Sequence, residues 1–138
     1  MLDIKSRVSD PSVLALLSYS IGVPTSAKLD GVCGRYQFEP NWILMGYELD
    51  GDMVGCVGVE IPQPGHATVR HFAVMPEHRS QGIGRSMLRQ LPDELSLVQL
   101  VAETDSGALR FYQQCGFDVE SLGELYPGVE LFRCTLVL

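Results

Sequence analysis

The chain has 138 residues, of which 46% are hydrophobic and 20% are charged, and its formal net charge is −7 at pH 7. The length allows one domain with a hydrophobic core over residues 1–138, and the composition is that of a globular protein rather than a disordered one. The negative net charge disfavours binding to the phosphates of nucleic acids, and no apolar run is long enough to cross a membrane.

The predicted elements begin with a strand at residues 2–8, followed by a helix over "SDPSVLALLSYSIG". Ser9 or Asp10 can cap this helix through a side-chain oxygen. The next stretch, residues 23–40, is ambiguous between a short helix and a loop. The N-terminal part therefore predicts one strand and one or two helices.

Three strands follow as an antiparallel meander. "WILMGYEL" and "MVGCVGVEI" flank "DGD", which is a strong signal for a β-hairpin. "PQPG" forms the next turn, and "HATVRHFAV" is the third strand.

A helix is predicted from about residue 83 to 91, because its apolar residues fall on one face, with Pro92 just past its end. The short apolar run "SLVQLVA" then predicts a buried strand.

Residues 106–114 predict a second helix in this half, capped by Asp105 and stopped by Gly116. "FDVESL" and "VELFRCTLVL" supply the last two strands. This order of strands and helices indicates an α/β protein (α+β mixed) with helices packed on a mixed sheet.

The four cysteines are widely separated and form no Cys-x-x-Cys pair or Cys/His cluster with zinc-ligand spacing. No metal site is therefore expected. The N-terminus "MLDIKSRVSD" lacks the apolar segment of a signal peptide. Free thiols in a reducing cytoplasm are the simplest interpretation, and we expect a cytoplasmic location.

The stretch "HRSQGIGRSML" places Gly82 and Gly84 between a strand and a helix. The first N–H groups of a helix lack acceptors and attract anions, and glycines let a phosphate approach the backbone. A phosphate-binding loop with a lysine after the glycines is excluded by the sequence, and a dinucleotide fingerprint fails because its third glycine is replaced by Met87. On this evidence alone, an anion site and a simple turn both remain open.

Two longer strings resemble the GNAT superfamily of N-acetyltransferases. The family signature R/Q-x-x-G-x-G/A stands here as Arg79-Ser80-Gln81-Gly82-Ile83-Gly84, and a second signature, A-x-x-F-Y-x-x-x-G-F, runs from Ala108 to Phe117. The resemblance is close over residues 42–121 and looser elsewhere. It implies the GNAT fold: a central mixed, largely antiparallel sheet of six to seven strands, about four helices, and a splayed cofactor-binding strand.

The resemblance also implies a site for acetyl-CoA. In the family, the backbone N–H groups of the loop bind the pyrophosphate, and free main-chain groups of the splayed strand contact the pantetheine arm and the thioester carbonyl. Carried over, the strand contacts are Phe72, Ala73 and Val74, and the loop contacts are Gln81, Gly82, Ile83, Gly84, Arg85 and Ser86. Arg79 would shape this loop, which also contains Ser80.

Asp105 stands where the family often has an asparagine that contacts the cofactor. A carboxylate would weaken a phosphate contact, and capping of the following helix also accounts for this residue.

Tyr112 matches the family tyrosine that lies near the thioester sulfur as a general acid, although simple packing is the alternative. No base is evident: Glu60 and His71 are candidates, and a chain of water molecules is a third. The alternatives are a solvated strand end for Glu60 and a hydrogen-bonded core histidine for His71. Strand alternation places Val69, His71 and Ala73 on one face.

The sequence therefore predicts an acetyl-CoA-dependent N-acetyltransferase, an acyltransferase that moves an acetyl group to a primary amine by direct attack. The acceptor, a small molecule or a peptide, is not specified. No nucleic acid or membrane partner is expected, and a homodimer is compatible with the family. Two alternatives stay open: a non-catalytic CoA-binding regulatory or interaction module on the same scaffold, and a phosphate-binding protein unrelated to CoA.

Overall fold

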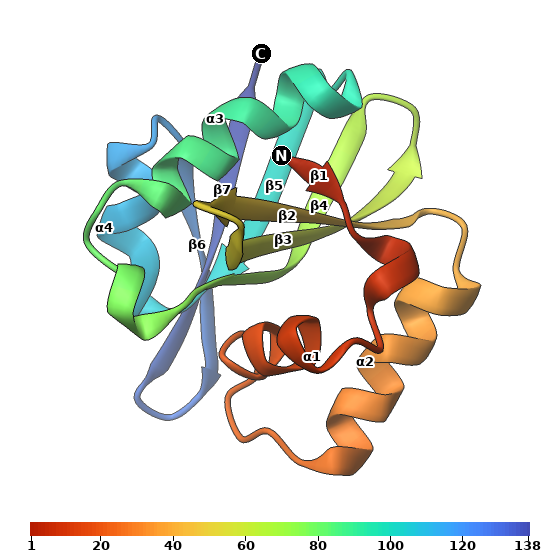
Figure 1. Ribbon diagram of the computed structural model, residues 1–138. Coiled ribbons are helices and arrows are strands. Elements are labelled where there is room, and N and C mark those ends of the chain that lie inside the picture. The colour runs from red at the N-terminus through yellow and green to blue at the C-terminus, as the bar shows by residue number, and fades with distance from the viewer.

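The computed structural model describes residues 1–138 and contains one seven-stranded sheet with the strand order β1-β2-β3-β4-β5-β7-β6 (Figure 1). Only β4 and β5 pair in parallel, so the sheet is mixed and largely antiparallel, as predicted. The strands are β1 (Leu2–Asp3), β2 (Trp42–Leu49), β3 (Asp52–Gln63), β4 (His66–Val74), β5 (Gln99–Thr104), β6 (Asp118–Tyr126) and β7 (Val129–Val137). The helices are α1 (Pro11–Ser18), α2 (Ser26–Phe38), α3 (Ile83–Leu95) and α4 (Ser106–Gln114), with short 3-10 helices at Lys5–Arg7 and Pro76–His78.

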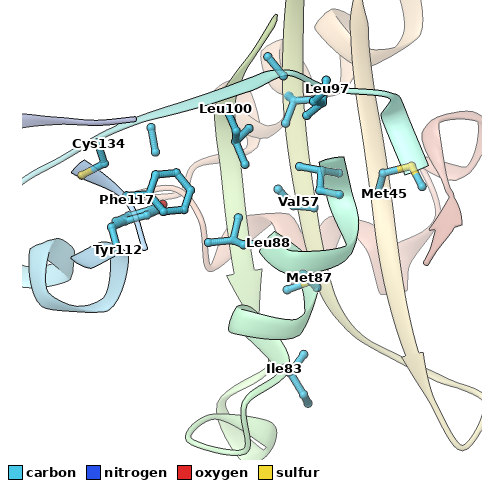
Figure 2. Close-up of a cluster of buried hydrophobic side chains, with 14 of the residues drawn as sticks. Met45, Val57, Ile83, Met87, Leu88, Leu97, Leu100, Tyr112, Phe117 and Cys134 are labelled. Carbon is cyan, nitrogen blue, oxygen red and sulfur yellow. The ribbon is translucent and has the colours of Figure 1, made fainter. Parts of the chain in front are cut away.

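Two hydrophobic clusters hold the helices against the sheet. One joins α3 and α4 to the sheet, and Figure 2 shows Leu88 of α3 pointing toward Tyr112 and Phe117. The other joins α1 and α2 to the sheet and includes Tyr36 and Ala73. Burial of apolar side chains on both sides of one sheet is the main stabilising contribution to such a layered fold.

The N-terminal elements differ from the prediction in two places, and one ambiguous stretch is resolved. The strand predicted at residues 2–8 is limited to Leu2–Asp3, because the Asp3 carboxylate accepts the N–H of Lys5 at 3.0 Å and a 3-10 helix follows. The ambiguous stretch 23–40 contains α2, whose first turn is capped by the Thr25 hydroxyl. Asp10 precedes α1 without capping it, since its carboxylate accepts a hydrogen bond from Arg7 instead.

The prediction that α3 ends before Pro92 is wrong, because the helix continues to Leu95. A proline within a helix removes one hydrogen bond and usually kinks or ends the helix. Here Pro92 is buried with Leu91, and the helix closes later, where Ser96 takes a left-handed conformation and Leu97 N–H donates to the Pro92 carbonyl at 2.8 Å. Burial at the end of α3 therefore outweighs the local preference of proline.

The strand β4 is splayed from β5, which confirms the expectation from the family resemblance. It pairs with β3 as far as Val74, but with β5 only from His66 to Thr68. The neighbour β5 continues to Thr104 by pairing with β7. From Val69 onward, the edge of β4 that faces β5 therefore has no strand partner.

A bulge in β4 changes which side chains share a face. The partners of His71 and Val69 in β3 are the adjacent residues Gly58 and Val59, so Arg70 is an extra residue in the ladder. Val69 packs with the cluster of α3 and α4, whereas His71 hydrogen-bonds to Tyr36 on the opposite face. The prediction that Val69 and His71 share a face is therefore wrong.

Candidate functional site

A cleft of about 670 Å³ opens where β4 separates from β5. Its walls come from the end of β4, the loop before α3, the first turn of α3, and one face of α4. The residues that line it include Phe72, Ala73, Val74, Arg79, Ser80, Gly82, Ile83, Gly84, Arg85, Ala108, Phe111 and Tyr112.

The loop side of this cleft carries a run of free backbone N–H groups. No N–H of residues 80–85 donates a hydrogen bond within the protein, and no side chain caps the start of α3. The helix dipole adds positive potential at the same place, so the run is suited to bind an anion. The structure corrects one predicted contact, because the N–H of Ser86 donates to the Gly82 carbonyl at 3.0 Å.

The two glycines of the loop serve different purposes. Gly82 has a φ of +81°, a left-handed conformation in which most side chains are strained, and a Cβ there would meet only open space. A Cβ on Gly84 would lie 3.1 Å from Phe72 Cζ and 3.3 Å from Phe111 Cζ. Gly82 therefore sets the path of the loop, and Gly84 lets the first turn of α3 pack against the aromatic wall of the cleft.

Arg79 joins the loop to β4 and to Tyr19, the residue that directly follows α1. Its Nε donates to the Val74 carbonyl at 3.0 Å, and its guanidinium carbon lies 5.5 Å from the centre of the Tyr19 ring. These contacts tie the start of the loop to the end of β4 and to Tyr19.

The backbone of β4 offers further donors to the cleft. Met75 N–H donates to the Val54 carbonyl of the β3 side at 2.8 Å, so by alternation the backbone of Ala73 also faces β3. The N–H groups of Phe72 and Val74 face the edge that has no strand partner. Of the three predicted strand contacts, these two are available to a ligand and Ala73 contributes only as a wall.

Tyr112 lies at the wall of the cleft formed by α4. Its ring packs edge-on against Phe111 and Phe117 at centroid distances of 5.4 and 5.3 Å, and its hydroxyl has no hydrogen-bond partner in the protein. Burial, with smaller contributions from Cys134 and Cys115, raises the pKa of Tyr112 to about 12. The phenol therefore keeps its proton at neutral pH.

The sequence of this segment matches a known protein family. The family described as an acetyltransferase (GNAT) domain matches residues 40–119, more than half of the chain. The chain belongs to the GNAT acetyltransferase family. It is therefore an acyltransferase. The free N–H groups and the splayed strand lie in the matched segment, which also supplies every residue that lines the cleft except Tyr19.

Relatives of known sequence or structure agree with this assignment. An uncharacterized N-acetyltransferase in the lysA 3′ region of Bacillus methanolicus is 28% identical over 115 residues, which cover 83% of this chain and 94% of the relative. An aminoglycoside 6′-N-acetyltransferase complexed with coenzyme A has a TM-score of 0.75 at 15% identity, with 93% of this chain and 92% of the other covered. A GNAT acetyltransferase from Elizabethkingia anophelis with acetyl-CoA bound has a TM-score of 0.68 at 20% identity, with 94% and 93% covered. These two structures share the GNAT fold with this chain.

Glu60, a candidate base, forms an ion pair in this GNAT protein. Its Oε1 accepts hydrogen bonds from Arg70 Nη2 at 2.7 Å and Nε at 3.0 Å. Arg70 in turn lies over the Trp42 ring. Glu60 does not line the cleft, so its position reduces the case for a base at this residue.

His71, the other candidate base, belongs to an aromatic cluster on the side of α2. A hydrogen bond of 2.6 Å joins its Nδ1 to the Tyr36 hydroxyl, and Trp42 packs against both rings. Burial, together with the charge of Arg70, lowers the pKa of His71 to about 4. The imidazole is neutral at pH 7, but it accepts a proton too weakly to suit a general base.

Sequence reasoning missed the partner in this pair, Tyr36. The available signal was Gly58, a glycine inside a strand, which often marks a close approach by another group. A Cβ on Gly58 would overlap the Tyr36 hydroxyl. The glycine therefore makes room for the tyrosine to reach His71.

The lowered pKa of His71 predicts how stability depends on pH. Its folded-state value of about 4 lies below the ordinary 6.5, so this contribution is present above pH 6.5 and is lost as the pH falls toward 4. Urea unfolding between about pH 7 and pH 4.5 should show a steeper loss of stability in the native protein than in His71→Asn. Asparagine can keep a hydrogen bond to Tyr36 and does not titrate. Identical pH dependence in the two proteins would contradict the assignment.

Asp105 acts as a helix cap. Its Oδ1 accepts a hydrogen bond from Gly107 N–H at 2.9 Å at the start of α4, and the residue does not line the cleft. The capping interpretation of the sequence accounts for this geometry.

The structure was also searched for membrane-spanning helices and for groups of metal-ligating side chains. None of its helices combines the length and the apolar content needed to cross a lipid bilayer. No group of three or more His, Cys, Asp or Glu side chains is arranged to hold a metal ion.

Proposed function

We propose that the protein is an acetyl-CoA-dependent N-acetyltransferase that transfers an acetyl group to a primary amine by direct attack. The observation that carries the proposal is the run of free N–H groups at residues 80–85, which lies beside the open edge of β4. A pyrophosphate needs several donors at one place, and a pantetheine arm contains amides that can pair with a strand edge. The residues present therefore fit acetyl-CoA, which would supply an acetyl group activated as a thioester.

The main chain of β4 provides the first contribution to the reaction. The N–H groups of Phe72 and Val74 face the open edge, where either can donate to the thioester carbonyl oxygen. Such a donor stabilises the negative charge that develops on the oxygen when an amine attacks. A preorganised donor of this kind contributes about 3 kcal/mol in other acyl-transfer enzymes.

Tyr112 provides the second contribution by donating a hydrogen bond to the departing sulfur. With a pKa of about 12, the phenol is a weaker acid than a thiol with a pKa of about 8.5. Complete transfer of its proton to the thiolate would then be uphill by roughly 5 kcal/mol. We therefore assign Tyr112 a role in which it stabilises the thiolate through its O–H, and the proton that finally reaches the sulfur comes from the solvent or the amine.

The proton released by the amine is assigned to water. Glu60 is held by Arg70 and His71 by Tyr36, so neither of the two candidate bases is free. An amine that enters uncharged needs only one proton acceptor after attack, and ordered water can serve when the reactants are well oriented.

The acceptor is proposed to be an amine on a small molecule or a peptide. The aminoglycoside 6′-N-acetyltransferase of the same fold acts on an amine of an aminoglycoside, as its name states. In this chain Glu124 and Glu130 lie opposite each other on β6 and β7, on an exposed hairpin. Their negative charge is compatible with a cationic acceptor.

The proposal is tested by measuring thiol release from acetyl-CoA in the presence of alkylamines, polyamines, aminoglycosides and peptides with a free N-terminus. We expect binding of CoA by isothermal titration and release of thiol that depends on one class of amine. The N-acetylated form of the active amine should release none, which separates transfer to the amine from simple hydrolysis. No CoA binding would overturn the proposal.

The same measurements discriminate the alternatives. Binding of CoA without release by any amine would support a regulatory or interaction module. Competition by ATP with no competition by CoA would support a phosphate-binding protein unrelated to CoA.

A further inference from the structure

The bulge in β4 decides which backbone N–H groups face the cleft. Along the ladder with β3, the N–H of His71 points to β3 and the N–H of Phe72 points to the open edge. Because Arg70 is an extra residue, the alternation shifts there, and Thr68 is the next residue of β4 whose N–H points to β3. If the bulge were lost while the start of β4 kept its pairing, the Phe72 N–H would turn toward β3. The bulge is therefore a condition for a donor at this place in the cleft.

Both residues at the bulge are held on the face of the sheet that α2 covers. This face is opposite to the one covered by α3 and α4 (Figure 1). Consecutive residues of a regular strand point to opposite faces, yet Arg70 and His71 both lie against the Trp42 ring, with Arg70 Cζ at 5.9 Å and the centre of the His71 ring at 6.2 Å from its centre. The ion pair between Arg70 and Glu60 is exposed, so it adds little to this restraint. The more buried restraint is the hydrogen bond of 2.6 Å between the Tyr36 hydroxyl and His71 Nδ1.

The hydrogen bond between Tyr36 and His71 is well suited to hold one backbone position. Tyr36 is fully buried, and burial raises the pKa of Tyr36 and lowers the pKa of His71, so both groups are neutral at pH 7. The hydroxyl has no other partner in the protein, so it donates to Nδ1. Any shift that broke this bond would leave a buried polar group unpaired, which is costly. The bond therefore restrains β4 at the residue directly before Phe72, although neither side chain lines the cleft.

Phe72 is restrained from the other face as well. Its ring packs against Phe111 at a centroid distance of 5.7 Å, on the side of α3 and α4. We propose that Tyr36 and His71 are positioning residues for the reaction, and that their hydrogen bond holds the β4 bulge so that the Phe72 N–H donates to the thioester carbonyl oxygen. The inference rests on the proposed function, in which Phe72 and Val74 are the two candidate donors to this oxygen.

The first test measures the hydrogen bond to the carbonyl oxygen without any amine. Acetyl-CoA with ¹³C at the acetyl carbonyl is bound to the protein, and its C=O stretching frequency is measured by infrared difference spectroscopy. A donor lowers this frequency in the native protein relative to free acetyl-CoA. In Tyr36→Phe and His71→Leu the frequency should return toward the free value. The affinity for acetyl-CoA, measured by isothermal titration, should change by less than about twofold, because the N–H groups of residues 80–85 are untouched.

The second test measures turnover with the active amine of the thiol-release screen. In Tyr36→Phe and His71→Leu, kcat should fall about tenfold while the KM for acetyl-CoA changes by less than about twofold, because a displaced donor acts mainly in the transition state. The double variant should be about as slow as either single variant, since only one hydrogen bond is lost. His71→Asn should lose less than about threefold, because asparagine can keep a hydrogen bond to Tyr36.

Cys33→Ala is the matched control. Cys33 is a buried residue of α2 in the same hydrophobic cluster as Tyr36, and its thiol donates to the Val8 carbonyl. The variant loosens the packing of α2 without removing a partner of His71. It should lower the temperature of thermal unfolding, as the other variants do, and leave the carbonyl frequency and kcat unchanged.

Four outcomes would overturn the inference. A native carbonyl frequency equal to that of free acetyl-CoA would mean that no donor reaches the oxygen. An unchanged frequency in both Tyr36→Phe and His71→Leu would mean that the bulge holds without this hydrogen bond. An equal loss of kcat in Cys33→Ala, or a loss of acetyl-CoA affinity as large as the loss of kcat, would show a general loosening of the fold. These results leave the proposed function intact, whereas failure of the native protein to bind acetyl-CoA or CoA would refute the proposed function and this inference with it.

Discussion

Gly82→Val should weaken CoA binding by about a hundredfold, the largest effect that we expect from any single change in the loop. At a φ of +81°, a β-branched side chain is strongly strained, because its Cβ crowds the adjacent carbonyl groups. The loop relieves this strain by changing its backbone path, which turns the N–H groups around Gly82 away from their common direction. The loss of one or two hydrogen bonds to a charged phosphate, each about 1.5–3 kcal/mol, accounts for the expected loss of affinity.

Gly22→Val is the control for this experiment. A Cβ at Gly22 also meets only open space, but its backbone is not in the left-handed region. The two variants therefore introduce the same side chain with and without backbone strain. Unchanged CoA binding in Gly82→Val, measured by isothermal titration, would mean that the loop N–H groups do not hold the ligand.

Most of the fold from Trp42 to Phe117 was predictable because its signals are local. The "DGD" turn defines the first hairpin, the Asp105 cap begins α4, and Gly116 ends it with a φ of +92°. Each of these features depends on a few neighbouring residues. The extent of α3 was not predictable in this way, because the burial of Pro92 is a property of the folded chain and not of its neighbours in the sequence.

The splay of β4 and its bulge show the limits of sequence patterns in the site. No residue type marks the point where pairing with β5 stops, and the splay was expected only because of the family resemblance. The extra residue at Arg70 likewise leaves no signal in a strand of alternating residues, yet it moves His71 to the face of Tyr36. The absence of acceptors for the N–H groups of residues 80–85 follows from the start of a helix after a glycine turn, a feature that is visible in the sequence. The exception was Ser86, whose N–H already belongs to the helix.

Tyr112→Phe should reduce turnover by about a hundredfold while it changes CoA affinity by less than about twofold. Phenylalanine keeps the edge-on packing against Phe111 and Phe117, so the cleft keeps its shape and only the O–H is lost. A group that stabilises the departing sulfur acts in the transition state, and its loss therefore lowers kcat and kcat/KM together. The measurement is steady-state thiol release with the identified amine, beside titration of CoA.

Tyr47→Phe is the control. It removes a hydroxyl from a half-buried tyrosine outside the cleft and should leave turnover and CoA affinity unchanged.

The dependence on pH separates the role of Tyr112 from simple packing. Because its pKa is raised to about 12, the phenol stays protonated and native turnover should show no loss from its ionisation up to about pH 10. The raised pKa also affects the free energy of unfolding. The contribution of the neutral phenol to stability is present below pH 10 and is lost as the pH rises toward 12. Tyr112→Phe should therefore lose less stability than the native protein over this alkaline range. If turnover in the variant equals that of the native protein at every pH, Tyr112 serves only to pack α4 against the sheet, and the sulfur departs without help from this side chain.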